Sequence, residues 1–300
     1  PYFYFKLQEI DIGTYKNIFQ SLWHAFFHSI SAINNAGFDI TGASSFALYS
    51  NDIWVKFIMI ILIIIGGIGF PVIHDLKRFL THRFVYKDSQ IFKWSLFTKL
   101  TVQTYFTIFI IGALLSIGFE VFSQSPKSLW NTALTSKAVS TNGVYTKFEV
   151  INSIIFTTFS TRNAGFSTIP IQEFQETTKM LWSAMMWIGS SPASTAGGIR
   201  TTTFAIAFLA IFSKWRSRGA NRINAFKHRI PAKTVYQSLV VVFSSIVLIW
   251  LSVVFIILDA QYTTQLLLEK PIFTFNNVFF EVASAFGTTG LSAGITPLLT

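Results

Sequence analysis

The chain has 300 residues, of which 51% are hydrophobic and only 12% charged, and its mean hydropathy is +0.51. Because a soluble domain carries about 25% charged residues, this composition excludes most soluble classes and indicates an integral membrane protein. Thirty-three Phe and eight Trp suit lipid and membrane interfaces. With no Cys, the chain has neither a disulfide framework nor a thiolate metal site, and its five His show no metal-ligand spacing.

The net charge of +10 is concentrated in two short loops that follow long apolar runs. Residues 77–93 hold five basic residues, and residues 214–233 hold seven with no acidic residue among them. Under the positive-inside rule both loops are expected to be cytoplasmic. We expect no nucleic-acid partner, because no aromatic or groove-reading motif accompanies the basic residues.

Four apolar segments are long enough to span a bilayer, which takes about 20 helical residues. Taken in chain order, with both basic loops inside, they run inward, outward, inward and outward: Ile53–Ile73, Leu100–Phe119, Leu181–Phe212 and Leu239–Leu258. Lys56 and Arg200 are the only charged residues within them.

Three further apolar segments are too short to span: Leu22–Ile33, Val150–Phe159 and Phe273–Phe286. Each lies on the predicted outer side and leads into a glycine motif, NNAGFD, TRNAGFS or FGTTGLS. Aligned on Gly37, Gly165 and Gly290, the motifs are 128 and 125 residues apart. Short apolar helices are typical of re-entrant segments, and a threefold recurrence indicates an internal repeat.

Re-entrant loops of this kind are suited to binding a cation. The C-terminal end of a short helix carries partial negative charge, and the returning backbone can replace an ion's water shell with carbonyl oxygens. Glycine permits the positive φ angles that such a loop requires. The predicted carbonyl ligands are those of Asn35, Ala36, Gly37, Asn163, Ala164, Gly165, Thr288, Thr289 and Gly290. The alternative is a helix cap followed by an ordinary extracellular loop.

The segment 177–213 is expected to break within the membrane. As one helix its 37 residues would be about 55 Å long, against a hydrocarbon core of about 30 Å. Its middle is rich in poor helix formers and hydroxyl side chains: Gly189, Ser190, Ser191, Pro192, Ala193, Ser194, Thr195, Ala196, Gly197 and Gly198. Irregular backbone at that depth must line a water path or be buried in protein. A small-residue packing face is the alternative.

Arg200, at the end of this stretch, could repel cations, pair with an acid on a neighbouring helix or reach the cytoplasmic interface. Asp39 and Glu281 near the outer loops could concentrate cations or cap local structure. For Gly66 and Gly67 we expect helix packing. No membrane-enzyme motif is present, and repeats sharing one orientation argue against an inverted-repeat transporter.

The motifs NNAGFD, TTFSTRNAGFST and GSSPASTAGGIRTTT, with GGIGF at 66–70, resemble the membrane subunits of the Ktr/Trk/HKT potassium transporters, above all the Ktr branch. The resemblance covers almost the whole chain. It implies an all-α membrane protein of repeated helix–re-entrant pore loop–helix units around a pseudo-fourfold pore, with three of four pore loops visible. The single pore domain 1–300 would divide into a partial second repeat (1–80), a third (81–230) and a fourth lacking its last helix (231–300).

The same resemblance implies uptake of K⁺ across the cytoplasmic membrane, with residues 189–198 and Arg200 as an intramembrane gate below the filter. A homodimer in membrane lipid and a cytosolic nucleotide-binding (RCK-type) ring are the implied partners, and no cofactor is expected. A sodium-conducting or sodium-coupled member is the alternative, because the first filter loop would precede Pro1. On this reading about 100–150 further residues come before Pro1.

Overall fold

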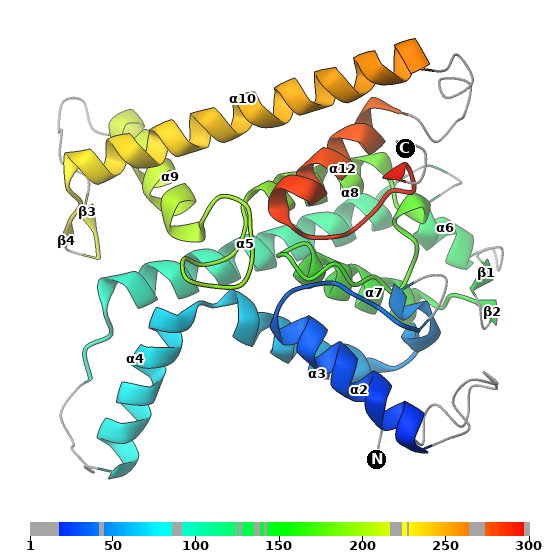
Figure 1. Cartoon of the computed structure of the whole chain (residues 1–300), viewed down its shortest axis with the longest axis horizontal. Coiled ribbons are helices and arrows are strands. Elements are labelled where there is room, and N and C mark those ends of the chain that lie inside the picture. The colour runs from blue at the N-terminus through cyan, green and yellow to red at the C-terminus, as the bar shows by residue number, and fades with distance from the viewer. Residues whose placement is uncertain are drawn as a thin grey trace.

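A computed structural model describes residues 18–41, 45–85, 92–123, 125, 128–134, 139–140, 143–216, 224–226, 228–263 and 274–296. Within these residues, nearly all of the regular structure is helical (Figure 1). The helices are α2 (Ile18–Ile33), α3 (Ile53–Gly67), α4 (Phe70–Leu80), α5 (Leu96–Val121), α6 (Leu129–Leu134), α7 (Lys147–Ser160), α8 (Glu176–Trp187), α9 (Thr201–Arg216), α10 (Ala232–Thr263) and α12 (Phe275–Gly287). Short helical turns cover Ser45–Tyr49, Thr81–Val85 and Ile171–Glu173.

Two small antiparallel hairpins complete the regular structure of the described residues, β1 (Val139–Ser140) with β2 (Gly143–Val144) and β3 (Asn224–Ala225) with β4 (His228–Arg229). The basic residues Lys87, Arg218, Arg222 and Lys227 of the predicted cytoplasmic loops lie outside the described residues.

Polar residues cap the helices where an apolar stretch of the sequence begins. Asp52 accepts hydrogen bonds from the backbone N–H groups of Trp54 and Val55 at the start of α3. Thr146 and Glu149 form a reciprocal capping box at the start of α7. Such caps satisfy the N–H groups that have no partner within the helix, and so they set where each helix starts.

Within the described residues, two unbroken helices are long and apolar enough to cross a membrane, α5 and α10. The three short apolar segments form the helices α2, α7 and α12, as predicted. The long segment 177–213 breaks where expected, since α8 ends at Trp187 and α9 begins at Thr201.

The predicted span Ile53–Ile73 is not one continuous helix, although its two parts together are long and apolar enough to cross a membrane. Helix α3 ends at Gly67 and α4 begins at Phe70, and the two helices are bent by 101° relative to each other. Gly69 adopts φ +85°, and a Cβ on it would lie 2.5 Å from the carbonyl oxygen of Pro192. The α8–α9 loop packed against this point therefore requires both a positive φ and the absence of a side chain.

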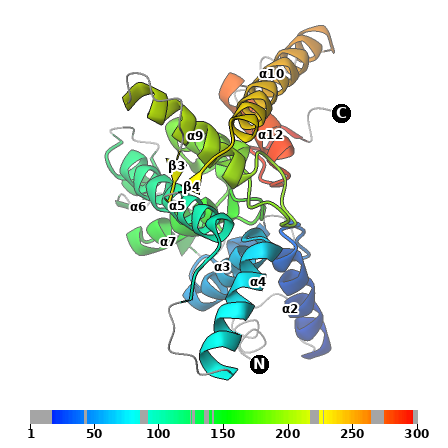
Figure 2. The ribbon, with the colours of Figure 1, turned by 90° about the vertical axis from the view of Figure 1, so that its left-hand side faces the viewer.

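The helices follow one another around a common centre in a repeated pattern (Figures 1 and 2). Helix α7 packs on α3 and on α5. In the same way, α12 packs on α8 and on α10. One packing relation therefore occurs twice along the chain, as expected for an internal repeat.

Candidate functional site

The three glycine loops share one backbone conformation. The glycine itself is left-handed in each, with φ of +73° at Gly37, +78° at Gly165 and +84° at Gly290. The residue two positions earlier is also left-handed, with φ of +50° at Asn35, +89° at Asn163 and +52° at Thr288. Non-glycine residues rarely adopt this conformation, so its recurrence at equivalent positions supports the repeat predicted from the sequence.

The first and last loops also leave their helices by the same hydrogen bonds. Asn35 N–H donates to Ala32 O and Ala36 N–H to Ser31 O, over 3.1 and 2.8 Å. Thr288 and Thr289 make the equivalent bonds to Ala285 O and Ser284 O, over 3.0 and 2.8 Å. This is the Schellman ending, in which a left-handed residue turns the chain back at the helix terminus. The C-terminal ends of α2 and α12 are thus fixed with their partial negative charge beside the loops.

The three loops meet at one point. A Cβ on Gly37 would lie 2.8 Å from Ala164 O and 3.1 Å from Gly165 Cα. A Cβ on Gly165 would lie 2.3 Å from Thr289 O, and one on Gly290 would lie 3.9 Å from Gly165 Cα. Two of the predicted ligand carbonyls, those of Ala164 and Thr289, therefore face the junction of the loops. A helix cap by itself would not bring together glycines more than 100 residues apart.

Three buried polar atoms in the segments that form this junction have no hydrogen-bond partner among the described residues. These atoms are Asn35 Oδ1, Ser160 Oγ and Thr289 Oγ1. Buried polar atoms are usually satisfied by protein, water or an ion. The junction thus has the lining of a hydrated or ion-binding site rather than that of an apolar core.

A side-chain clamp holds the chain where it leaves two of the loops. His28 Nε2 lies 2.9 Å from Asp39 Oδ1, and Glu281 Oε1 accepts a 2.7 Å hydrogen bond from Ser292 Oγ. In both pairs the helix residue lies nine positions before the glycine and its partner two positions after it. Asp39 and Glu281 therefore act as local caps in this structure, one of the two alternatives for them.

The environment of Asp39 favours its ionised form. Burial opposes ionisation of this carboxyl, but hydrogen bonds from His28 and from the hydroxyl and backbone N–H of Thr41 outweigh it, so the pKa of Asp39 lies below its usual value. The carboxylate is held by His28 of α2 and by Thr41, two residues further along the loop, so its charge serves the clamp.

The irregular loop between α8 and α9 touches all three glycine loops. Asn35 Nδ2 donates to Thr195 Oγ1 over 3.1 Å, and Gly197 N–H donates to Thr288 Oγ1 over 2.9 Å. Ser190 Oγ donates to Arg162 O over 2.9 Å. The beginning, the middle and the end of the predicted gate stretch 189–198 therefore each contact a different glycine loop.

The same loop also packs on the bend of the preceding helix pair. Ser191 N–H donates to Gly67 O and Phe70 N–H to Ala193 O, both over 3.1 Å. Gly66 is itself a packing position, because a Cβ there would lie 2.0 Å from Ile33 O. The small residues of this region therefore allow three backbone segments to approach closely, as expected for Gly66 and Gly67.

Arg162 is a further residue of the site, which the sequence reasoning missed. Its side chain is 0% exposed, its Nη2 donates to Gly189 O over 2.8 Å, and its guanidinium lies 5.0 Å from the centre of the Tyr105 ring. Nε and Nη1 have no hydrogen-bond partner among the described groups. The charge of Arg162 could have identified it from the sequence, because an ionisable residue at membrane depth is a functional candidate by default.

Arg200 is placed differently from Arg162. Its Nη1 donates to the carbonyl oxygens of Ser191 and Ala196, within the irregular loop itself. No carboxylate in the described part of the chain forms an ion pair with it. Pairing with an acid on a neighbouring helix, one of the alternatives for Arg200, is therefore not observed in the described residues, and its guanidinium bonds to the loop instead.

Comparison with known proteins places these features in a family. The family model TrkH, described as cation transport protein, matches residues 4–300. The Ktr system potassium uptake protein D of Bacillus subtilis is 35% identical, with 94% of this chain and 55% of the relative covered. The potassium/sodium uptake protein NtpJ of Enterococcus hirae is 28% identical, with 94% and 54% covered.

Among solved structures, the potassium transporter TrkH from Vibrio parahaemolyticus aligns with a TM-score of 0.58 at 16% identity, over 93% of this chain and 58% of that one. This likeness shows a shared fold, the all-α membrane-protein fold expected from the sequence. The chain spans about half the length of the curated relatives it matches. Its match to the family model over nearly all its residues shows that this chain belongs to the TrkH family of cation transport proteins, in its Ktr/Trk branch.

Proposed function

We propose that this chain forms much of the pore of a potassium uptake transporter in the cytoplasmic membrane. The filter is built from the backbone carbonyls of residues 35–37, 163–165 and 288–290, and the ion is K⁺. The observation that carries this proposal is the meeting of three left-handed glycine loops, with the carbonyl oxygens of Ala164 and Thr289 at their junction. Carbonyl oxygens in that arrangement can replace the hydration shell of a monovalent cation.

The loop of residues 189–198, with Arg200, is proposed as the gate. Its hydrogen bonds to all three glycine loops support a position directly beside the filter. It has no regular secondary structure, and its hydrogen bonds mostly run to other segments rather than within it. Segments of that kind open at lower free energy than packed helices. Arg200→Ala is expected to raise flux mildly, because it removes a positive charge from the closed path.

The repeat units are proposed to lie at 1–80, 81–230 and 231–300, with the basic loops 77–93 and 214–233 cytoplasmic and the glycine loops extracellular. Excess Lys and Arg in short loops supports this orientation. A homodimer with a cytosolic nucleotide-binding ring is proposed as the working assembly, since relatives of this chain are named as components of a Ktr system.

A sodium-conducting or sodium-coupled transporter of the same architecture is the second candidate. It is favoured by the relative named for potassium and sodium uptake. The two candidates share the loops described above and differ in the ion that the assembled filter prefers.

The test is ion flux into liposomes that contain the full-length protein, measured separately for K⁺, Rb⁺ and Na⁺, with and without the cytosolic partner. Preference for K⁺ and Rb⁺ over Na⁺ supports the potassium proposal. Equal or greater Na⁺ flux favours the second candidate, and absence of all three fluxes in a folded protein that retains its partner would overturn both.

A further inference from the structure

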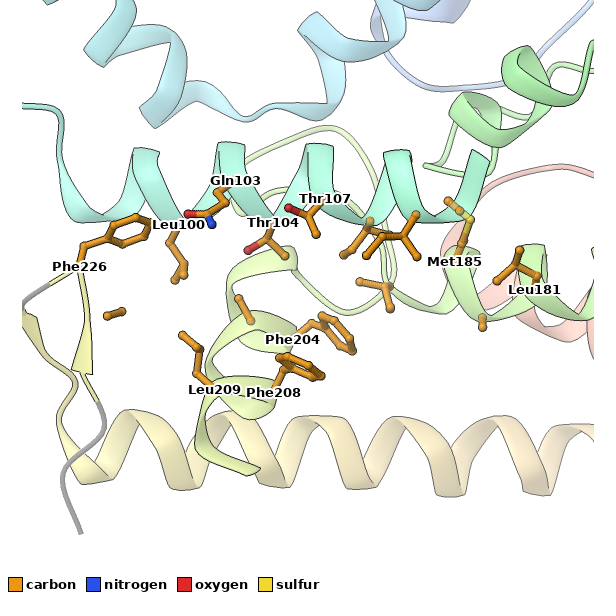
Figure 3. A pocket seen from close by; sticks show the side chains of 17 residues that line it. Leu100, Gln103, Thr104, Thr107, Leu181, Met185, Phe204, Phe208, Leu209 and Phe226 are labelled. Carbon is orange, nitrogen blue, oxygen red and sulfur yellow. The ribbon is translucent and has the colours of Figure 1, made fainter. Parts of the chain in front are cut away.

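A cavity of about 600 Å³ lies between α5, α8, α9 and the β3–β4 hairpin (Figure 3). Its walls are mostly apolar: Leu100 and Ile111 from α5, Leu181 and Met185 from α8, and Phe204 and Phe208 from α9 are among the lining residues. The volume lies within the range of small-molecule binding cavities.

The cavity has the length of one leaflet of a bilayer. It extends along α5 from Leu100 to Gly112, a rise of about 18 Å along the helix axis. One half of a hydrocarbon core is about 15 Å deep. Since α5 is one of the two described helices able to cross a membrane, an apolar cavity along half of it matches the reach of a single lipid tail.

Exposed basic residues lie close in sequence to residues that line this cavity. Lys99 precedes the lining residue Leu100, and Arg229 belongs to the hairpin that supplies the lining residues Ala225 and Phe226. Lys214 lies one turn and a half beyond the lining residue Leu209. All three basic side chains are exposed. Basic groups where a pocket between membrane helices meets the cytoplasmic surface attract anionic headgroups.

We propose that this cavity binds an anionic phospholipid, with one acyl chain along α5 and its phosphate among Lys99, Lys214 and Arg229. The proposal rests on the membrane orientation given under the proposed function. Apolar walls supply the site for the tail, and the three exposed basic residues select a negatively charged headgroup.

The bound lipid touches both arms of the proposed gate. Met185 and Ile188 line the cavity just before the irregular loop begins, and Phe204 and Ala205 line it just after the loop ends. A ligand shifts an equilibrium by its difference in affinity for the two states. A tail held between these arms therefore favours the loop conformation in which the cavity has its present shape.

The test measures retained lipid by native mass spectrometry of the full-length protein, purified with phosphatidylglycerol or with phosphatidylcholine added. We expect phosphatidylglycerol to be retained preferentially, and Lys99→Gln and Arg229→Gln each to lower its retention about fivefold. Ala184→Trp, at an exposed lining position, fills the cavity and should lower retention of both lipids. Lys147→Gln, at an exposed residue of α7, is the matched control and should change nothing.

Equal retention of the two lipids, or retention that is insensitive to Ala184→Trp, would overturn the proposal. A third outcome, in which Ala184→Trp separates a dimer without changing retained lipid, would show that a second copy of the chain covers the cavity, and the lipid proposal would fall. The readout does not depend on ion flux. A protein that retains phosphatidylglycerol but conducts no K⁺ would contradict the proposed function and leave this inference standing.

Discussion

Arg162 is the residue whose replacement tests most directly how the glycine loops and the α8–α9 loop are coupled. Its guanidinium lies between the two, stacked on Tyr105 of α5 and bonded to the carbonyl oxygen of Gly189. Replacement by Met keeps a long, flexible side chain but removes the charge and every donor. If the α8–α9 loop must leave Gly189 O unbonded when it retracts, the Met variant should open more readily.

The size of the effect follows from which contacts differ between the two states. The stacking on Tyr105 is worth about 2 kcal/mol when desolvated, but both partners lie outside the moving loop, so this contribution cancels. The hydrogen bond from the charged Nη2 to Gly189 O does not cancel, and such bonds contribute about 1.5–3 kcal/mol. Removing it should raise the ratio of open to closed protein by about 10- to 150-fold.

The assay is Rb⁺ flux into liposomes that contain the full-length protein without its cytosolic partner, normalised to folded protein after size-exclusion chromatography. Arg162→Met should raise this flux within the stated range, and Arg162→Lys, which retains a charged donor, should raise it less. Ser190→Ala removes a neutral hydrogen bond to Arg162 O and should raise it by about 2- to 12-fold.

Tyr105→Phe is the matched control, because the Tyr105 hydroxyl is buried with no hydrogen-bond partner among the described groups while its ring carries the stacking. Its flux should equal that of the parent. Parental flux in a folded Arg162→Met variant would refute the reasoning, since the bond to Gly189 would then not distinguish the two states. An effect of Ser190→Ala larger than that of Arg162→Met would refute the assignment of the main contact.

Gly165→Ser should lower discrimination of K⁺ from Na⁺ in competition assays, because its Cβ would lie 2.3 Å from Thr289 O, and it should leave membrane insertion intact. Gly290→Ser, whose Cβ would have its nearest contact at 3.9 Å, should lower discrimination less. A larger effect of Gly290→Ser than of Gly165→Ser would contradict this geometry. Deleting Ser190–Ala196 should raise partner-free flux in liposomes, and a folded deletion variant that conducts no faster than the parent would show that the loop is a structural kink. Gly66→Ala should lower thermal stability in detergent, because its Cβ would lie 2.0 Å from Ile33 O. Gly118→Ala is the control and should leave thermal stability unchanged, because its Cβ would have no atom within 4 Å. Equal losses of thermal stability in the two variants would count against the close packing of α2 on α3.

Much of the local structure could be predicted because it depends on residues close together in the chain. The lengths of α2, α7 and α12, the positive φ at each motif glycine and the break after Trp187 all follow from apolar run length and from where glycine, proline and hydroxyl residues stand. Membership of the family followed from the motifs themselves, and the comparisons confirm it. The ion ligands and the gate stay predictions.

Other features required the tertiary structure, because they depend on segments far apart in sequence. The chain bends at Gly69 because the carbonyl of Pro192 approaches it, and no local pattern around GGIGF indicates that neighbour. Arg162 is visible in the sequence as a charge beside Asn163, but its contacts with Tyr105 and Gly189 arise only when α5 and the α8–α9 loop pack around it. The sequence by itself determined the conformation of each loop, through backbone preferences that extend over a few residues. Which loops meet, and which charge lies between them, was decided by packing between helices more than 25 residues apart.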